Sequence, residues 1–387
     1  MTTFDKIHIQ GFRRLHDVDL KLRPLMVLIG ANGCGKTSLL DVFSLLAASA
    51  SGDLNQTMSD LGGIESNLSN LASANGGKSR SMAFDLAMGN KHPEPIRYRV
   101  ALAARGVGYE IADETLTQPQ MQEAREIKRI DAHHGDVHYC SPDGSRIAPN
   151  WDYDAAETAL SQVPKVYKQP EDFRKRLASS THYHVLDVSR RAPIRLPQQM
   201  RDARLPGHDG ADLVSCLYTL RETDPDRYDT VEDTLRAGFP GFERLNFPLV
   251  AAGTVAMTWK DATSKQPFYM HQLSEGTLRF LWLVSLLQSP GLSAVTLIDE
   301  PEVSLHPELL SLLADLFRES SQRTQLIVAT HADRLVRSLQ PSEVATIDVN
   351  DSGAAEMTWA DELDLDQWLD DYTLDEVWRL GRMGGRS

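Results

Sequence analysis

The chain has 387 residues, and its 54 acidic against 40 basic side chains give a formal net charge of −14. A composition of 41% hydrophobic and 24% charged residues is that of a globular protein, which excludes a fibre or a disordered chain. The length fits two to three domains, or one large domain with an insertion. The three cysteines lie far apart, so they form neither a disulfide framework nor a cysteine-based zinc site, and they fit a reducing compartment.

The distribution of apolar and charged residues predicts neither a membrane span nor a secretory signal. No apolar run reaches the ~20 residues that a membrane span needs, and the N-terminus has no secretory signal. We therefore expect a cytoplasmic protein with no membrane partner. The acidic charge argues against nonspecific adhesion to nucleic acid, although it is unevenly spread, because residues 351–387 hold ten acids and three arginines.

The N-terminal quarter begins with strand signals. Residues 4–9 and 18–22 alternate apolar with polar side chains, which predicts an antiparallel pair of half-buried strands. Residues 25–29 form a continuous apolar run, typical of a strand buried on both faces. Apolar residues at helical spacing then predict a helix over 36–50. A glycine-rich loop therefore lies between a buried strand and a helix.

This loop, Gly30-Ala-Asn-Gly-Cys-Gly-Lys36-Thr37, has the pattern in which backbone N–H groups surround a phosphate at the start of a helix. We expect Lys36 to reach the β and γ phosphates of a nucleotide and the Thr37 hydroxyl to bind Mg²⁺. Cys34 is either an inert small residue or a thiol made reactive by Lys36 and the helix N-terminus. The predicted cofactor-binding residues here are Gly30, Asn32, Gly33, Cys34, Gly35, Lys36, Thr37 and Ser38.

Two further buried-type strands end in polar residues. Residues 294–298 run into Asp299-Glu300-Pro301-Glu302, and residues 326–330 are followed by His331. Ligands of open parallel sheets bind beyond the carboxyl ends of the strands, so these side chains are expected beside the phosphate loop. We predict that Asp299 binds the metal, that Glu300 activates the attacking water and that His331 faces the γ-phosphate.

The remaining chain is predicted more coarsely. Residues 51–77 read as a loop or short helices, and residues 81–140 as antiparallel strands. Helices are expected over 153–178 and 209–238, strands over 245–259 and a second α/β block over 278–349. No internal repeat and no sustained heptad occurs, which excludes a long coiled-coil arm.

A family resemblance follows from these motifs. Leu273-Ser-Glu-Gly-Thr277 resembles the signature motif of ABC-type ATPases, with Glu275 where a small residue is common. Ser304-Leu-His-Pro307 looks like a D-loop, so five motifs of the family occur in the expected order. The opening residues 7–15 are similar to those of RecF-type and overcoming-lysogenization-defect-type ATPases, and residues 372–385 are similar to the tails of predicted ATPases of this group.

The resemblance implies an α/β P-loop ATPase of the ABC, RecF and SMC head type, with a mostly parallel core sheet, an antiparallel β lobe and a helical insertion. Such a head binds ATP and Mg²⁺ and forms a homodimer around ATP, so that Ser274 and Gly276 of one copy face the phosphates held by the other. Ser274 can equally serve as the N-cap of the helix that follows it. The implied catalytic residues are Lys36, Glu300 and His331.

We expect residues 1–50 and 245–350 to form the ATP-binding core, 51–244 the β lobe and helical lid, and 351–387 an acidic, aromatic helical tail. The resemblance suggests ATP-driven closure of two heads in DNA repair or anti-phage defence, together with an effector or nuclease partner. Two alternatives stay open, a nucleotide-binding subunit of an ABC transporter and a non-hydrolysing regulatory scaffold.

Three other groups of residues allow two interpretations each. Residues 165–204 carry ten basic and four acidic side chains, which suits either a DNA contact or a solvated face. The pair Asp364 and Asp366 is typical of nuclease sites but arises easily in an acidic tail. The aromatic tail 361–379 either packs on the protein or docks a partner, and Thr373 with Glu376 predicts a capping box.

A fourth group is rich in histidine. His133, His134, Asp136 and His138 either bind a metal or form a solvated hairpin turn at Gly135.

Overall fold

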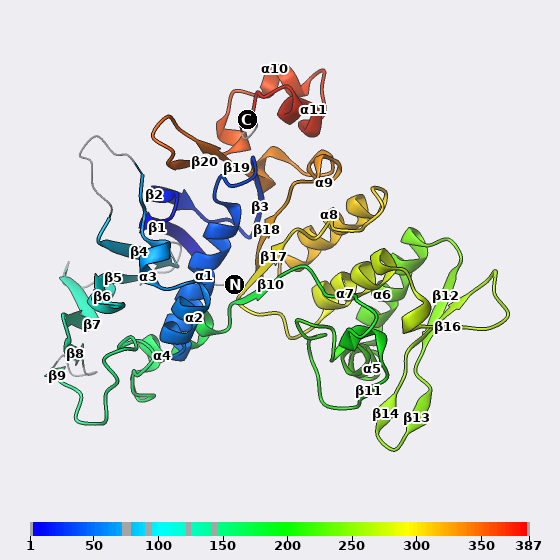
Figure 1. The fold of residues 1–387 in the computed structure, drawn as a ribbon, viewed down its shortest axis with the longest axis horizontal. Helices are drawn as coiled ribbons and strands as arrows, with labels where there is room; N and C mark the ends of the chain where they lie inside the picture. Colours follow the sequence, from blue (N-terminus) through cyan, green and yellow to red (C-terminus); the bar gives the residue numbers. More distant parts are fainter. Residues whose placement is uncertain (1–2, 72–78, 90–94, 121–124, 141–144, 385–387) are drawn as a thin grey trace.

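The structure is a computed structural model that describes residues 3–71, 79–89, 95–120, 125–140 and 145–384. Its centre is a six-stranded sheet in the order β10-β17-β18-β3-β19-β20, in which the first five strands are parallel and β20 is antiparallel (Figure 1). These strands are β3 (Leu25–Ile29), β10 (Thr181–Tyr183), β17 (Val295–Asp299), β18 (Gln325–Ala329), β19 (Val344–Val349) and β20 (Ala355–Trp359).

Strand β3 explains why the apolar run is continuous. All five of its residues are buried, and they alternate between two hydrophobic clusters on the two faces of the sheet. Val27 belongs to one cluster, whereas Met26 and Leu28 belong to the other. A strand covered on both faces has no polar side, so the predicted buried strand is confirmed.

The Met26 side of the sheet is covered by α1 (Lys36–Ser51) and by an eight-stranded antiparallel sheet in the order β2-β1-β4-β5-β6-β7-β8-β9. Helix α4 (Lys168–Ala178) packs on α1. The strands and short helices of this lobe are β1 (Phe4–Phe12), β2 (Leu15–Lys21), β4 (Ser81–Met88), β5 (Ile96–Arg105), β6 (Gly108–Gln120), β7 (Arg125–His133), β8 (Asp136–Cys140), β9 (Arg146–Ile147), α2 (Leu54–Asp60) and α3 (Ile64–Asn67).

The Val27 side is covered by a helical lobe with two small sheets, which lies across the central sheet from α1 in Figure 1. The small sheets have the orders β11-β14-β13 and β12-β15-β16. This lobe contains α5 (Leu213–Thr223), α6 (Pro225–Gly238), α7 (Glu275–Gln288), α8 (Leu309–Ser320), η1 (Pro193–Arg195), η2 (Met270–Gln272), β11 (Gln198–Gln199), β12 (Phe242–Asn246), β13 (Leu249–Ala251), β14 (Thr254–Val255), β15 (Thr258–Asp261) and β16 (Phe268–Tyr269).

The C-terminal tail packs on the protein. Thr373 forms the predicted capping box with Glu376, and Val377 and Trp378 lie in the same hydrophobic cluster as Val27. The interpretation that the tail aromatics pack on the parent protein is therefore confirmed for Trp378. The elements of this region are α9 (Asp333–Arg337), α10 (Asp366–Leu369), α11 (Leu374–Arg379), η3 (Pro341–Glu343) and η4 (Ala360–Glu362).

Two predicted helices were wrong in extent. Residues 153–167 form turns, and the helix begins only at Lys168, because the N–H groups of Ala159 and Leu160 bond to the Glu114 carboxylate instead of to a helix. The segment 209–238 is two helices, since Pro225 cannot continue α5 and Asp224 instead caps α6.

Several strands pair in a different sheet from the one that their predicted segment implies. Strands β1 and β2, placed with the core, pair within the antiparallel sheet, whereas β10, placed with the lobe, joins the parallel sheet. Strand β20, placed in the tail, pairs with β19. Within the described parts of the chain, no helix is long and apolar enough to cross a membrane.

Candidate functional site

The motif residues converge on one edge of the central sheet. Gly30 follows β3, Asp299 ends β17 and His331 lies two residues beyond β18. Asp299 is in register with Ala329, and Ala329 is in register with a residue of β3. Because these strands are parallel and adjacent, their carboxyl ends bring together side chains that are hundreds of positions apart.

The phosphate loop has the backbone shape of an anion site. Gly30 and Gly35 have φ angles of 155° and 123°, which side-chain-bearing residues rarely adopt. A Cβ atom on Gly30 would lie 2.4 Å from the carbonyl oxygen of Ile347. Helix α1 begins at Lys36 without a side-chain cap, so its first N–H groups are available to a phosphate.

Lys36 is buried within this loop. Its Nζ donates to the carbonyl oxygens of Gly30 at 2.7 Å and Ala31 at 3.0 Å. Burial lowers the pKa of Lys36, although the nearby Cys34 and Asp299 oppose that shift. Cys34 is itself buried, which favours the inert interpretation over the reactive one, because reactive thiols are partly exposed. Asn32 and Gly33 are exposed at the tip of the loop.

Thr37 and Asp299 form an oxygen pair at the start of α1. The Thr37 hydroxyl donates to Oδ2 of Asp299 at 3.5 Å. Burial raises the pKa of Asp299, and the neighbouring Glu300 raises it further. A nearby cation would offset both effects. A hydroxyl and a carboxylate are ligands that Mg²⁺ accepts, so this pair fits the predicted metal site.

Glu300 and His331 lie close together beyond the ends of β17 and β18. The Glu300 backbone has φ of 48°, an uncommon left-handed conformation for a residue with a side chain. Its N–H donates to Ala329 O at 2.9 Å, while its Oε1 lies 3.9 Å from Nε2 of His331. Burial and then Lys36 lower the pKa of His331, and Glu300 opposes them.

Glu302 holds the histidine in place, a role that we did not predict. Its Oε1 accepts a hydrogen bond of 2.7 Å from the backbone N–H of His331. Burial raises the pKa of Glu302. The acidic run contained the signal, but its spacing alone could not show which acid turns toward His331.

The signature segment starts α7 on the other lobe. Ser274 is exposed, and its Oγ accepts a hydrogen bond of 3.1 Å from the N–H of Thr277, so the predicted N-cap is confirmed. A Cβ atom on Gly276 would lie 2.3 Å from the Ser304 carbonyl oxygen, and this approach requires glycine. Among the hydrogen bonds of the described residues, none joins Ser274 or Gly276 to the phosphate loop of the same chain.

Arg279 connects the start of α7 to two neighbouring segments, a role that we did not predict. Its guanidinium donates to Ser304 Oγ at 2.5 Å and to the Leu186 carbonyl oxygen at 3.2 Å. Ser304 has a positive φ of 63°, so it is a strained residue held in place by a side chain of the signature helix. Arg279 therefore links the signature helix to the segment after Glu300.

Two histidines at the end of β10 were not predicted. His182 Nδ1 lies 3.1 Å from the Ser44 hydroxyl, and burial together with His184 lowers the pKa of His182 to about 3. A strand of three residues is too short to show a period in the sequence, which is why the pattern gave no signal.

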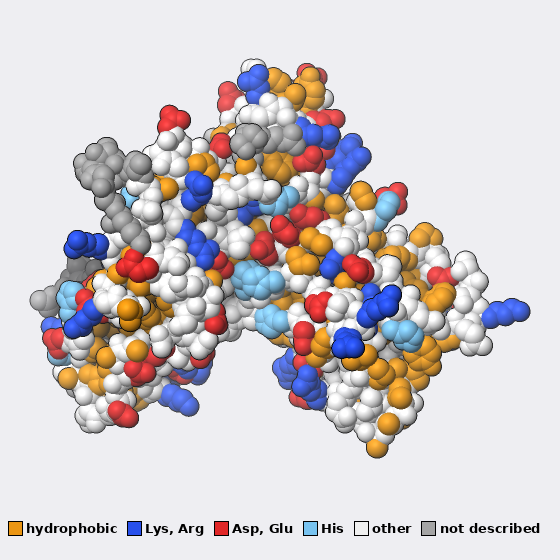
Figure 2. Space-filling model, in the orientation of Figure 1, with side chains coloured by type: hydrophobic (Ala, Val, Ile, Leu, Met, Phe, Trp, Pro, Cys, Tyr) orange, Lys and Arg blue, Asp and Glu red, His pale blue; other side chains and the backbone are white. Residues whose placement is uncertain are grey.

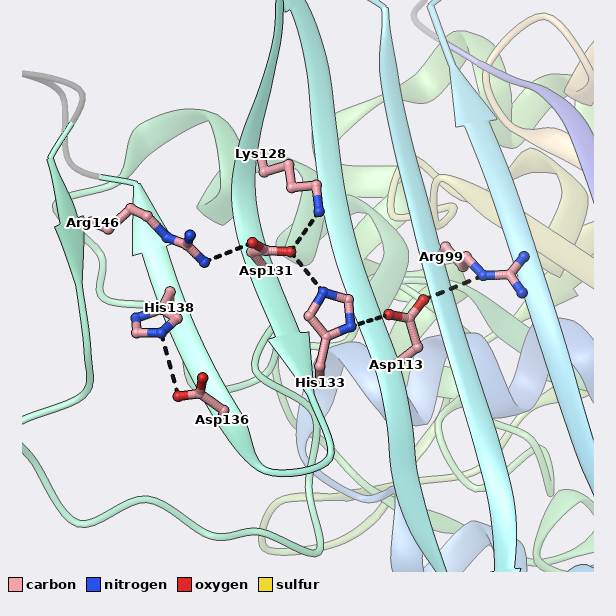
Figure 3. Close-up of polar contacts among 8 residues, drawn as sticks. All are labelled: Arg99, Asp113, Lys128, Asp131, His133, Asp136, His138 and Arg146. Atoms are coloured by element: carbon pink, nitrogen blue, oxygen red, sulfur yellow. Dashed lines mark hydrogen bonds and ion pairs between the residues drawn. The ribbon is translucent and has the colours of Figure 1, made fainter.

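The other histidine group is a hairpin. His134 and Gly135 both have positive φ at the turn between β7 and β8. His133 lies between Asp113 and Asp131, at 2.6 and 3.0 Å, and these acids also pair with basic side chains (Figure 3). Within the described residues, His182, His184 and Asp299 are the one group of three potential ligands within 4.8 Å, so neither this hairpin nor Asp364 and Asp366 form such a group.

The basic segment 165–204 is spread over two lobes, since α4 packs on α1 whereas β11 pairs with β14 (Figure 1). Several of its cations have partners within the chain. Arg174 and Lys175 pair with Glu171, and Arg195 donates to carbonyl oxygens that include Leu273 O at 2.9 Å. These three cations are therefore engaged within the chain, whereas contact of the segment with DNA stays a prediction.

Comparison with known proteins places this geometry in a family. The family model described as "AAA domain, putative AbiEii toxin, Type IV TA system" matches residues 25–337. The chain belongs to this AAA family. The match runs from β3 to α9 and so includes every motif that lines the sheet edge. No curated protein matches the chain.

Solved structures agree on the fold of this AAA protein. An Smc head bound to the C-terminal winged-helix domain of ScpA has a TM-score of 0.59 at 15% identity, over 95% of this chain and 99% of the other. The Smc head of Pyrococcus furiosus has 0.55 at 13%, over 96% and 98%. The Smc head of Pyrococcus yayanosii has 0.55 at 11%, over 98% and 100%. The predicted P-loop head fold is confirmed by these structures, and the predicted AAA family is confirmed by the family model.

Proposed function

We propose that the chain binds ATP with Mg²⁺ at the edge of the central sheet and hydrolyses it. In this proposal the loop N–H groups and Lys36 hold the phosphates, while Thr37 and Asp299 hold the metal. Glu300 takes the proton of the attacking water, and His331 donates to the γ-phosphate. Bound Mg²⁺ would supply charge neutralisation of the phosphates. The convergence of these side chains on one strand edge carries the proposal.

A second copy completes the site in this proposal. Ser274 is exposed at the N-terminus of α7 and makes no hydrogen bond to the phosphate loop of its own chain among the described residues. A helix N-terminus with an exposed hydroxyl can bind a phosphate of the nucleotide that another subunit holds. We infer that two chains close around ATP as a homodimer.

The output proposed here is a conformational switch. Arg279 connects the signature helix to Ser304, which follows Glu300, so closure of a second head on ATP would shift both segments together. The family description names a putative toxin of a toxin–antitoxin system. That description supports a role in a toxin–antitoxin system. A role in DNA repair or anti-phage defence, with an effector or nuclease as partner, is proposed from the motifs alone. DNA contact through 165–204 and a cytoplasmic location remain predictions.

The variant Glu300→Gln tests the proposal, since it keeps the shape of the side chain but cannot accept a proton. We expect ATP turnover to fall by roughly 10²- to 10⁴-fold while ATP binding persists, and the mass in solution to double when ATP and Mg²⁺ are added. Glu308→Gln, on an exposed side chain nearby, is the matched control and should retain both properties.

Two results would contradict this function. Unchanged ATP turnover in Glu300→Gln would show that Glu300 is not the general base. A protein that stays a monomer when ATP and Mg²⁺ are added would contradict the site shared between two copies. Wild-type protein that binds ATP and dimerises without turnover would instead identify a non-hydrolysing scaffold.

A further inference from the structure

Two imidazoles lie beside the acidic end of β17. One ligand atom each from His182, His184 and Asp299 lies within 4.8 Å of the others, and the two imidazole ring centroids are 3.9 Å apart. Figure 2 shows histidine side chains next to acidic ones near the middle of the drawn face. This cluster is distinct in composition from the oxygen pair formed with Thr37.

The sheet register creates this arrangement. Strand β10 runs parallel to β17, with His182 opposite Leu297 and Tyr183 opposite Ile298. Side chains alternate along strands, so His182 and Asp299 share the face on which Leu297 lies. His184 follows the strand, and its ligand atom lies within 4.8 Å of theirs. That face is covered by α1, and Ser44 of α1 touches His182. Tyr183 points to the opposite face, where its ring packs at 5.6 Å from Trp282.

One ring nitrogen of His182 is held by the protein, and the other is buried without a partner in the described part of the chain. Its Nδ1 lies 3.1 Å from the Ser44 hydroxyl, which fixes the ring from behind. Its Nε2 is buried and has no hydrogen-bond partner among the described residues. Ligating histidines typically have one ring nitrogen held by the protein and the other on the ion. A buried ring nitrogen without a partner is costly unless a ligand satisfies it.

The other two groups supply access and charge. His184 is exposed, so an ion can enter from solvent. Asp299 is partly buried and contributes a carboxylate oxygen. Two imidazoles and one carboxylate suit Zn²⁺ and neighbouring transition metals, which keep a further position for water, whereas Mg²⁺ prefers oxygen ligands alone.

We propose that His182, His184 and Asp299 form a binding site for a divalent transition-metal ion, with Zn²⁺ as the representative ion. The site lies beside the proposed nucleotide site and shares Asp299 with it. The metal site does not require bound nucleotide, because both imidazoles belong to β10 or to the residue after it and lie outside the phosphate loop.

The test uses the full chain without an affinity tag, stripped of metal and free of nucleotide. Zn²⁺ binding is measured by calorimetric titration, and Co²⁺ is added as an optical probe whose visible bands report nitrogen and oxygen ligands. We expect one ion to bind per chain, and we expect the visible absorption bands of bound Co²⁺ to indicate a low coordination number. A wild-type protein without saturable binding of either ion would overturn the proposal.

Variants assign the ligands. His184→Ala removes an exposed ring, so it should fold normally, and we expect Zn²⁺ binding to weaken by at least about 10- to 100-fold. His182→Gln should weaken binding in the same way, and thermal unfolding establishes that it is folded. His138→Ala, on β8, is the matched control and should bind as the wild type does. Equal Zn²⁺ affinity in His184→Ala and the wild type would overturn the assignment.

ATP binding measured in the same variant separates this proposal from the proposed function. Loss of Zn²⁺ with retained Mg–ATP binding in His184→Ala supports two sites. A wild type that binds Zn²⁺ but not ATP would support the metal site and contradict the nucleotide site.

Discussion

The Nε2 atom of His331 lies 3.9 Å from Oε1 of Glu300, although the two residues follow different strands of the central sheet. The position of His331 is fixed by the hydrogen bond of its N–H to Glu302, and that of Glu300 by the hydrogen bond of its N–H to Ala329 O. These hydrogen bonds fix the backbone positions from which the two side chains approach each other. In the proposed function, this pair would act on the γ-phosphate and the attacking water.

We expect His331→Gln to lower ATP turnover by about 10²-fold, because one preorganised donor to the phosphoryl group is lost. The dissociation constant for ATP should change little, since the loop and Lys36 carry most of the binding. Steady-state kinetics and an equilibrium titration measure the two effects. His134→Asn is the control, because His134 is an exposed histidine at the turn between β7 and β8, away from the motifs. Turnover equal to that of the wild type would show that His331 does not contact the phosphate.

Lys36→Met should weaken ATP binding by roughly 10- to 100-fold, because each hydrogen bond from a charged group contributes about 1.5–3 kcal/mol. The fold should survive, since the bonds of Nζ in the chain go to two loop carbonyls that water can also satisfy. A fluorescent ATP analogue measures the affinity, and Lys265→Met on an exposed side chain is the control. Unchanged affinity would mean that the lysine stays turned toward the loop when nucleotide binds.

Ser274→Asp separates the structural from the catalytic role of the signature serine. Aspartate is as good an N-cap as serine, so the unfolding free energy should stay within about 0.5 kcal/mol of the wild type. Its negative charge would repel the phosphate of the second copy, so ATP-dependent dimerisation and turnover should both be lost.

Ser274→Ala is the opposite control, because it removes the cap at a cost of about 1 kcal/mol without adding charge. Analytical ultracentrifugation with ATP and chemical denaturation provide the two measurements. If Ser274→Asp dimerises at the same ATP concentration as the wild type, Ser274 does not contribute to the shared site.

Glu114 should make stability depend on pH. Burial raises the pKa of this carboxyl from 4.5 to about 7, although the N–H groups of Leu160 and Ala159 oppose the shift. Between those values the folded chain holds a proton that the unfolded chain has released. This contribution to stability is therefore complete below about pH 4.5 and is lost as the pH rises through about 7, by at most about 1.4 kcal/mol per pH unit.

The difference in unfolding free energy between the wild type and Glu114→Gln, measured in urea from pH 5 to pH 8, isolates this effect. The difference should change with pH up to about 7 and then level off. Glu110→Gln, on the same strand but less buried, is the control. A difference that is independent of pH would show that Glu114 is ionised throughout.

Local signals predicted the parts of the site that are contiguous in sequence. The run 25–29 followed by glycines and Lys36 specified a buried strand, an anion loop and a helix, because each depends on backbone conformation and periodicity alone. The acid run at Asp299 and the single histidine after 326–330 were found for the same reason: both follow short apolar strands.

Tertiary structure decided what those signals could not contain. Strand β10 is too short to have a period, so its partner β17, and with it the meeting of His182, His184 and Asp299, follows from sheet pairing. The roles of Glu302 and Arg279 likewise depend on contacts across the chain. The sequence by itself determined the phosphate loop and the strand ends, since these are local. Their mutual distances required the register of parallel strands, which is set by long-range packing.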